Sequence, residues 1–214
     1  MANKFEPLIT VDAVSYTHLD VYKRQGEPGE ASLKKEVDHV HPHYRAFIEA
    51  APFAALATCG PDGLDVSPRG DPAGFVVVED EKTLLLPDRR GNNRIDSLRN
   101  ILADSRAALL FLVPGVNETL RVNGRARISV DPALLARFDI DGKSPRSVLV
   151  VDVETVYFQC SRALLRSRLW DPATQIPRTA LPSVGRMLSD LTAGTFDGVT
   201  YDRDQPARVA STLY

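Results

Sequence analysis

Short apolar stretches separated by turn residues follow one another between residues 53 and 87. Four of them follow one another so closely that no crossover helix fits between them, so the spacing predicts antiparallel strands. The predicted strands are residues 53–59, 64–70, 75–80 and 83–87, joined by turns at 60–63 and 81–82.

Three longer apolar stretches follow and predict the central strands of the same sheet. They span residues 106–115, 118–130 and 147–160, and the apolar run 109–113 is interpreted as core. Gly124 interrupts the second stretch, which indicates a bend or a bulge. Many short antiparallel strands with few helices between them predict a small, mainly β barrel.

Helical periodicity appears at the edges of this β pattern. Apolar residues from Leu33 to Ile48 share one helical face, which Pro42 should break or kink. Residues 93–104 predict a sharper helix, which Asn92 or Asn93 can cap. Weaker helices are expected at 131–138 (Asp131 as cap, Pro132 first), 161–172 and 183–191, and signals beyond them are weak.

Composition narrows the class of protein. The chain has 214 residues, 43% apolar and 25% charged, as is typical of a soluble globular protein. A net charge of −2 provides no basic field for nucleic acid or anionic lipid, and no apolar run is long enough to span a bilayer. Two cysteines do not form a disulfide framework, so we expect a cytoplasmic protein. From the net charge and the short apolar runs we expect neither a nucleic-acid partner nor a membrane partner.

The N-terminal stretch does not match the rest of the chain. Residues 13–25 follow no sustained period and resemble a translated adapter tract that contaminates gene calls. We interpret residues 1–25 as a suspect or disordered segment; the alternative is a native arm with little structure. The remaining chain is divided into one domain at 26–192 and a tail at 193–214.

An arginine-rich loop precedes the helix expected at 93–104. A helix N-terminus presents unpaired N–H groups and a positive dipole end, which bind anions. Arg89, Arg90 and Arg94 add charge in a form that matches phosphate. The competing interpretation is a solvated loop whose arginines pair with Asp88, Asp96 or Asp104, and we favour the anion site.

A second candidate contact is Arg69, in the stretch "SPRGDP". Pro68 and Gly70 flank it and stiffen the backbone around it. A rigidly held arginine suits an anchored ligand contact. An edge-strand turn with an Arg–Asp surface pair is an equally good interpretation of this stretch taken alone.

Together these stretches resemble a known family. The resemblance is carried by "ATCGPDGLDVSPRGDPAGFV", "LLLPDRRGNNRIDSLRNIL", "LLFLVPGVNETLRVNGRARI" and "RSRLWDP". These motifs look like the pyridoxamine 5′-phosphate oxidase-related FMN-binding split-barrel superfamily, in its bacterial branch of FMN-dependent proteins of unassigned substrate. The resemblance covers about residues 26–192. It implies a six-stranded antiparallel split β-barrel, and a homodimer with FMN at the subunit interface.

The resemblance also implies roles for individual residues. Arg69 corresponds to an arginine that reaches the FMN phosphate, and Pro87 and Asp88 to positions whose backbone meets the flavin ring. The other matching positions are a second phosphate set (Asn93, Arg94, Ser97), a strand from the partner subunit (Thr119, Arg121) and the segment that covers the ring (Arg166, Trp170). The usual Arg-Lys pair of the second phosphate set is replaced here.

The departures from the family bear on function. True pyridoxamine phosphate oxidases carry an Arg-x-His near the C-terminus, whereas this chain has "RSRLW" and no histidine after residue 43. We therefore expect an FMN-dependent oxidoreductase that moves electrons or hydride between a nicotinamide-type donor and a small organic acceptor or oxygen. The alternatives are a non-catalytic flavin- or haem-binding carrier or sensor, and a nucleic-acid binder, which the net charge argues against. A deazaflavin also fits, because it too carries a phosphate near a tricyclic ring.

Other chemistry-bearing residues are interpreted as structural. Of His39, His41 and His43 only the first and last share a helical face, so solvated histidines are favoured over a metal site. Cys59 and Cys160 are interpreted as inert buried thiols. Trp170 could equally stack on a ligand or anchor the core.

Overall fold

The computed structural model describes residues 28–214. The suspect segment 1–25, with the tract that resembles an adapter, lies outside the described residues. The chain divides after Glu36 into two units. The described part of the first unit contains one short helix, α2 (Glu30–Lys34). All elements below belong to the second unit, residues 37–214.

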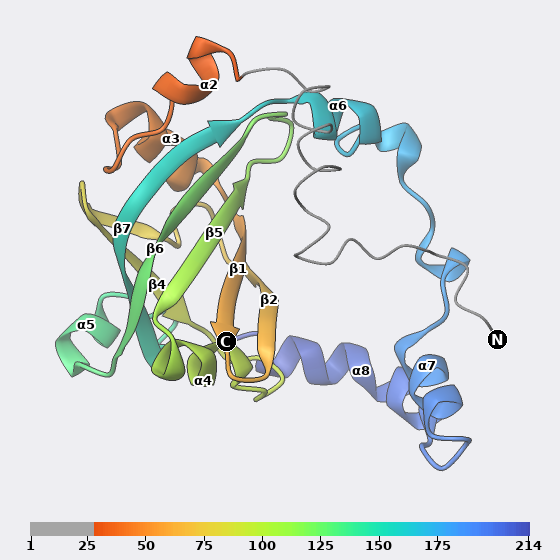
Figure 1. Cartoon of the computed structure of the whole chain (residues 1–214). Coiled ribbons are helices and arrows are strands. Elements are labelled where there is room, and N and C mark those ends of the chain that lie inside the picture. The colour runs from red at the N-terminus through yellow and green to blue at the C-terminus, as the bar shows by residue number, and fades with distance from the viewer. Residues whose placement is uncertain (1–27) are drawn as a thin grey trace, which may run out of the picture. The chain divides into compact units, whose positions relative to one another are not determined.

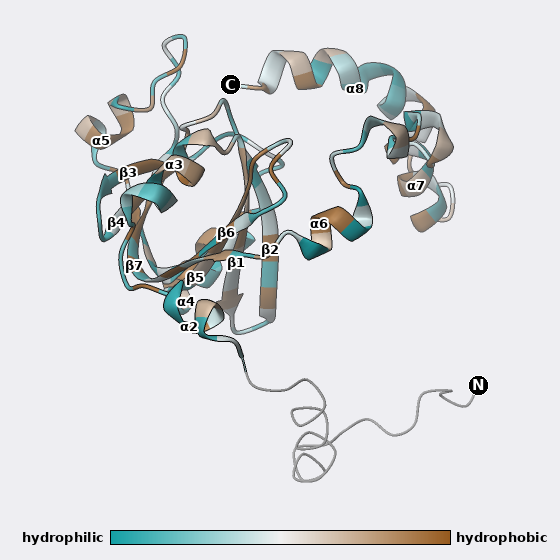
Figure 2. Ribbon diagram, turned by 90° about the horizontal axis from the view of Figure 1, so that it is seen from above, coloured by the Kyte–Doolittle hydropathy of each residue, from teal (hydrophilic) through white to brown (hydrophobic). Residues whose placement is uncertain are grey.

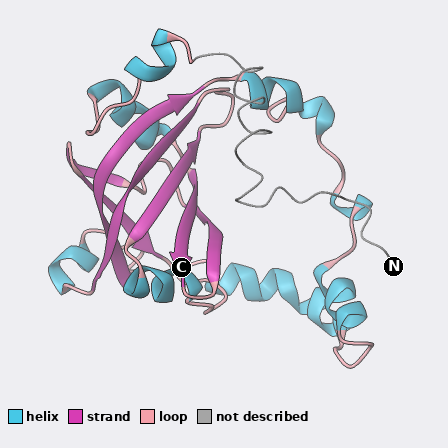
Figure 3. Ribbon diagram, viewed as in Figure 1, coloured by secondary structure: helices cyan, strands magenta, loops and turns pink. Residues whose placement is uncertain are grey.

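Seven antiparallel strands form one sheet in the order β2-β1-β5-β6-β7-β4-β3 (Figures 1 and 3). Their bounds are β1 (Phe53–Gly60), β2 (Gly63–Gly70), β3 (Val77–Asp80), β4 (Thr83–Asp88), β5 (Arg106–Leu112), β6 (Thr119–Ser129) and β7 (Ser147–Gln159). In the view of Figure 2 the strands curve around a common interior.

The expected mainly β fold with helices is confirmed, but the expected count of six strands is wrong. All seven stretches that the apolar pattern predicts as strands are strands in the structure. The six-stranded count came from the family resemblance. Strand β3 is only four residues long and pairs with β4 at the sheet edge, where it adds the seventh strand.

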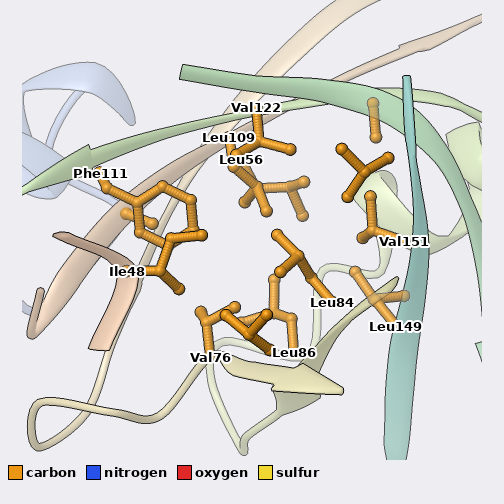
Figure 4. Packing of buried hydrophobic residues seen from close by; sticks show 14 of the residues in the cluster. Ile48, Leu56, Val76, Leu84, Leu86, Leu109, Phe111, Val122, Leu149 and Val151 are labelled. Atoms are coloured by element: carbon orange, nitrogen blue, oxygen red, sulfur yellow. The ribbon is translucent and has the colours of Figure 1, made fainter. Parts of the chain in front are cut away.

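The core fills the interior of the curved sheet. Its largest fully buried side chains come from β1, β4, β5, β6, β7, α3 and the residue before β3. Figure 4 shows several of them facing one another: Leu56, Leu84, Leu109, Phe111, Val122 and Ile48. Along β5 the burial alternates, so only Leu109 and Phe111 of the predicted core run 109–113 are fully buried.

A bulge interrupts the pairing of β6 with β7, as the glycine in this stretch predicts. The register shifts between Asn123 and Gly124. A Cβ atom at Gly124 would overlap the backbone oxygen of Asp152, so only glycine allows the two strands to approach this closely. A bulge bends the strand that contains it, so this one contributes to the curvature of the sheet.

Helices α3 and α5 each begin at a proline, with the preceding residue as the cap. Helix α3 (Pro42–Ala50) starts at Pro42, with His41 as its cap, which confirms a break at this proline. Helix α5 (Pro132–Ala136) is capped by Asp131, whose carboxylate accepts from the N–H groups of Ala133 and Leu134. Between them lies α4 (Asp96–Ala103), which packs mainly against β1.

The C-terminal stretch contains more helix than the sequence predicts. Its elements are α6 (Arg162–Ser167), η2 (Pro172–Thr174), η3 (Arg178–Ala180), α7 (Val184–Leu191) and α8 (Gly198–Thr212). Helix α8 was not predicted, because it is mostly polar and contains Pro206. The N–H of Gly185 donates to Asp202 at 2.7 Å and ties α7 to α8. Within residues 28–214, each helix is too short or too polar to cross a membrane.

Candidate functional site

An open cavity of about 960 Å³ lies where β2, β4 and the N-terminus of α4 meet. The loop between β4 and α4 forms one side of it, and the end of β6 and the start of β7 form another. Six of the ten predicted cofactor residues line this cavity: Arg69, Pro87, Asp88, Asn93, Arg94 and Ser97. The arginine-rich loop and the "SPRG" stretch are therefore brought to one place.

Arg69 links two strands that are far apart in the sheet order. It lies on the edge strand β2, and its Nη1 donates to Asp88 Oδ1 at the end of β4 over 2.6 Å. The two side chains are 17% and 19% exposed. The surface-pair interpretation of this arginine is thus wrong, because it is largely buried and its partner lies 19 residues away.

One polar atom of Arg69 has no partner. Its Nε is buried and forms no hydrogen bond in the described part of the chain. A buried donor without an acceptor is costly, so native structures rarely retain one without a reason. Because Arg69 lines the cavity, an acceptor on a bound ligand would remove this cost.

Arg89 is the second arginine held by a buried carboxylate. Its Nε donates to Asp71 Oδ2 over 2.9 Å, and the side chain of Asp71 is only 2% exposed. The other oxygen of Asp71 accepts from the Tyr214 hydroxyl at 2.6 Å. This hydrogen bond, burial and the charge of Asp71 raise the pKa of Tyr214. No local pattern in the sequence indicates this contact, since Tyr214 follows a helix that was not predicted.

Arg94 differs from Arg69 and Arg89. Its side chain is 76% exposed, and Nε donates to Asp96 over 2.8 Å. The hydrogen bond to Asp96 and its charge raise the pKa of Arg94. This is the pairing that the solvated-loop interpretation expected. Arg94 nevertheless lines the cavity, on the same side as Asn93.

The predicted asparagine cap of α4 is wrong. The cap position is Ile95, which has no capping side chain. Asn92 instead accepts from the backbone N–H of Arg94 at 3.0 Å, and Asn93 adopts a left-handed conformation with φ of 59°. Both asparagines therefore shape the loop before the helix, so the first N–H groups of α4 receive no side-chain cap.

A short chain of hydroxyls connects α4 to β2. Ser97 Oγ donates to Asp65 Oδ2 at 2.8 Å and lies 3.1 Å from Ser67 Oγ. Because Ser97 has a single proton and gives it to Asp65, the Ser67 hydroxyl must donate to Ser97. Ser97 is thus an occupied donor in this arrangement. Asp65 and Ser67 were not predicted as site residues.

The other four predicted cofactor residues lie away from the cavity. Thr119 Oγ1 donates to Gln159 at 3.3 Å, Arg121 Nη1 to the Tyr157 hydroxyl at 3.0 Å, and Trp170 Nε1 to the Val116 oxygen at 2.8 Å. Arg166 is exposed on α6.

Strand geometry separates these residues from the cavity. The cavity contains Ile128 near the end of β6, whereas Thr119 begins that strand. At about 3.4 Å per residue the two positions are roughly 30 Å apart. Figure 1 accordingly shows α4 at one end of the strands and α6 at the other. The ten residues do not form one site within one chain.

The remaining candidates have local roles. The His41 ring accepts from the His43 N–H at the start of α3, and His39 contacts Asp38 at 3.0 Å. Cys59 is half-buried and Cys160 is exposed, so the expectation of two buried thiols is wrong. No cluster of three or more potential metal ligands occurs among residues 28–214.

Comparison with protein families yields one match. The model of the family described as pyridoxamine 5′-phosphate oxidase matches residues 40–160, which is more than half of the chain. The matched region includes β1 to β7 and every residue that lines the cavity. No curated protein matches the sequence.

Comparison with solved structures yields distant likenesses. Group A Streptococcus HupZ is 19% identical with a TM-score of 0.45, over 55% of this chain and 92% of that chain. An FMN-binding protein from Syntrophomonas wolfei is 14% identical with a TM-score of 0.43, over 70% and 96% of the two chains. The FAD binding protein from Mycobacterium smegmatis is 15% identical with a TM-score of 0.40, over 57% and 97%.

Proposed function

The chain belongs to the pyridoxamine 5′-phosphate oxidase family, and from this premise we propose that its cavity binds FMN and that the loaded protein is an oxidoreductase. The observation that carries the proposal is the buried, unpartnered Nε of Arg69 in the wall of the cavity. It is the kind of donor that a phosphate oxygen satisfies.

The residues of the cavity fit FMN better than haem. Arg69, Arg94 and the first N–H groups of α4 would hold the phosphate, and Pro87 and Asp88 would lie along the ring. Haem iron requires an axial histidine, cysteine, methionine or tyrosine. The described residues that line the cavity include none of these four types.

Bound FMN would supply the electron chemistry, taking hydride or electrons from a nicotinamide-type donor and passing them to a small organic acceptor or oxygen. The protein's own contribution is position and charge. The Arg69–Asp88 pair orients the guanidinium group before any ligand arrives. The apolar wall that includes Phe75 and Ile128 excludes water from one side of the cavity.

We propose that the chain assembles as a homodimer, and the separation of the predicted residues supports this. Thr119, Arg121, Arg166 and Trp170 lie too far from the cavity of their own chain to reach its ligand. In a dimer with two-fold symmetry, the part of one subunit that contains Arg121 would lie at the cavity of the other subunit, next to that subunit's Arg69. The dimer would then contain two equal sites. Leu165 and Leu169, 56% and 48% exposed beside Trp170, offer apolar surface for such a contact.

The FMN site is tested with the double variant Arg69→Ala/Arg94→Ala. Charged hydrogen bonds to phosphate are strong, so we expect FMN affinity to fall by about 100-fold or more in calorimetry. Arg99→Ala is the matched control, because Arg99 is exposed on α4 outside the cavity. Equal FMN affinity in the wild-type chain and the double variant would refute the site.

The composite site is tested by subunit mixing. Arg69→Ala chains and Arg121→Ala chains are each expected to bind FMN poorly. If one site uses residues of both subunits, a dissociated and reassociated equal mixture regains about one quarter of the wild-type sites. A site built within one chain regains none. Light scattering of the wild-type chain separately reports whether it is a dimer.

Turnover distinguishes an enzyme from a flavin carrier or sensor. We expect NADH or NADPH to bleach the flavin absorbance without oxygen, and air to restore it. A flavin spectrum that neither donor changes would favour the carrier, while FMN binding itself would stand.

A further inference from the structure

The cavity has a second polar end, at the start of β7. Asp88 and Ser147 are direct partners in the pairing of β4 with β7. Because the strands are antiparallel, the segments after Asp88 and before Ser147 leave the sheet side by side. This arrangement brings Arg146 and Ser147 to the cavity, which both of them line.

Ser147 carries the other unpartnered polar atom of the site. The residue is 5% exposed, and its hydroxyl forms no hydrogen bond within residues 28–214. Together with Arg69 Nε it makes up the set of buried side-chain nitrogen and oxygen atoms in the described chain that lack a partner. Both residues line the same cavity, which indicates that a ligand satisfies them there.

The unpaired cations of the cavity include the arginine next to Ser147. Arg69, Arg89 and Arg94 are each matched by a carboxylate. Arg90 and Arg146 also line the cavity, and neither has an acidic partner in the described part of the chain. Arg146 is therefore an exposed guanidinium group, next in sequence to the buried Ser147, and guanidinium and hydroxyl donors together suit an oxyanion.

We propose that Arg146 and Ser147 form a substrate subsite for the carboxylate of a small apolar organic acid. The proposal rests on the proposed function, since it places the acid in the cavity that holds FMN. The body of the acid would lie on apolar wall residues near this end, which include Pro87, Ile128 and Val130.

The charge balance of the cavity selects a carboxylate over a second phosphate. Five arginines line the cavity, against three lining aspartates and Asp71, which pairs with Arg89, so the formal balance is +1. A dianionic flavin phosphate already exceeds this charge. A second dianion would meet net repulsion in a partly buried site, whereas a monoanion on Arg146 meets less.

The probes for this subsite differ only in the group offered to Arg146. Benzoate carries a carboxylate, benzamide is its neutral counterpart, and phenyl phosphate carries a dianion on the same ring. Each is titrated by calorimetry into the full chain, first with FMN bound and then without flavin. With FMN bound, we expect benzoate to bind at least about 10-fold more tightly than benzamide and than phenyl phosphate; without flavin, the comparison is between benzoate and benzamide.

Two variants locate the binding. Arg146→Gln should weaken benzoate about 10-fold and leave FMN affinity within about twofold, because Arg146 is outside the phosphate set. Ser147→Ala should weaken benzoate less, as it removes one neutral hydroxyl. Arg99→Gln, on an exposed arginine of α4 outside the cavity, should change neither ligand.

The outcomes separate this subsite from the flavin site. Benzoate binding that Arg146→Gln leaves unchanged overturns the subsite, as does equal binding of benzamide, or tighter binding of phenyl phosphate when FMN is bound. If FMN bound neither to the wild-type chain nor to any variant, the proposed function would instead be refuted. The titration without flavin then still reports whether Arg146 binds a carboxylate.

Discussion

Two parts of the cavity wall hold their arginines in different ways. We call them the strand side, which is β2 and the end of β4 with Arg89 directly after it, and the loop side, which is the rest of the loop before α4. On the strand side, Arg69 and Arg89 are each 17% exposed and pair with the largely buried carboxylates of Asp88 and Asp71. On the loop side, Arg94 is 76% exposed and its partner Asp96 is 40% exposed. The same residue type at the same cavity is rigid on one side and solvated on the other.

The difference teaches what burial adds to a charge. A largely buried pair is weakly screened and has few alternative rotamers, so the strand side presents fixed donors. The exposed pair is screened by water and salt and contributes little to stability. We infer that the strand side holds its donors in a fixed orientation, and that breaking one of its pairs is costly, whereas the loop side provides affinity that forms when an anion arrives.

The largest expected effect comes from Arg69→Met. It leaves Asp88 largely buried without its cation, so we expect a loss of about 3 kcal/mol in the free energy of unfolding, measured in urea. Arg69→Met/Asp88→Leu should recover much of that loss, because it removes the unpaired charge. If Arg69→Met were as stable as the wild type, Arg69 would contribute as little to stability as the exposed arginine of the loop side.

A smaller effect is expected from Asp71→Asn. The amide oxygen can still accept from Tyr214, but the charge that holds Arg89 is gone. We expect a loss of about 1–2 kcal/mol in the free energy of unfolding. Asp104→Asn is the comparison, since its partner Arg106 is 65% exposed. Equal losses in the two variants would contradict the role given to burial.

The contact of Tyr214 with Asp71 predicts a dependence on alkaline pH. The folded state raises the pKa of Tyr214 above its ordinary value of about 10, so the contact stabilises the chain fully below that value. It is lost as the pH rises through the folded pKa. Tyr214→Phe should speed proteolysis of the α8 end about fivefold near neutral pH. It should also remove one late step from the tyrosinate absorbance titration.

The smallest effect on stability is expected from Arg94→Gln. Its ion pair is exposed, so the melting midpoint should stay unchanged in calorimetry. FMN should nevertheless dissociate faster in stopped-flow fluorescence, since a charged contact to phosphate is lost. If Arg94→Gln lowered the melting midpoint and left FMN release unchanged, the loop side would contribute to stability and not to affinity, which would contradict the role inferred for it.

Local pattern determined most of the fold. The seven strands follow from alternating apolar residues and turn residues, and helix α5 begins at Asp131 and Pro132 as its cap predicts. These features depend on neighbours within a few residues, so the sequence records them directly. Helix α8 escaped prediction because its polar face and Pro206 leave no apolar period. The predicted asparagine caps are wrong because Asn92 accepts a hydrogen bond within the loop and Asn93 adopts a left-handed loop conformation.

The sequence by itself determined that arginines gather near a helix start and that Arg69 lies on a stiff strand. Only the tertiary structure decided which carboxylate each arginine meets, because Asp88, Asp71 and Tyr214 arrive from distant strands and a distant helix. It also decided that Arg146 and Ser147 reach the cavity, through the pairing of β7 with β4. Pairing partners and burial are set by the register of strands far apart in the chain, which no local pattern encodes.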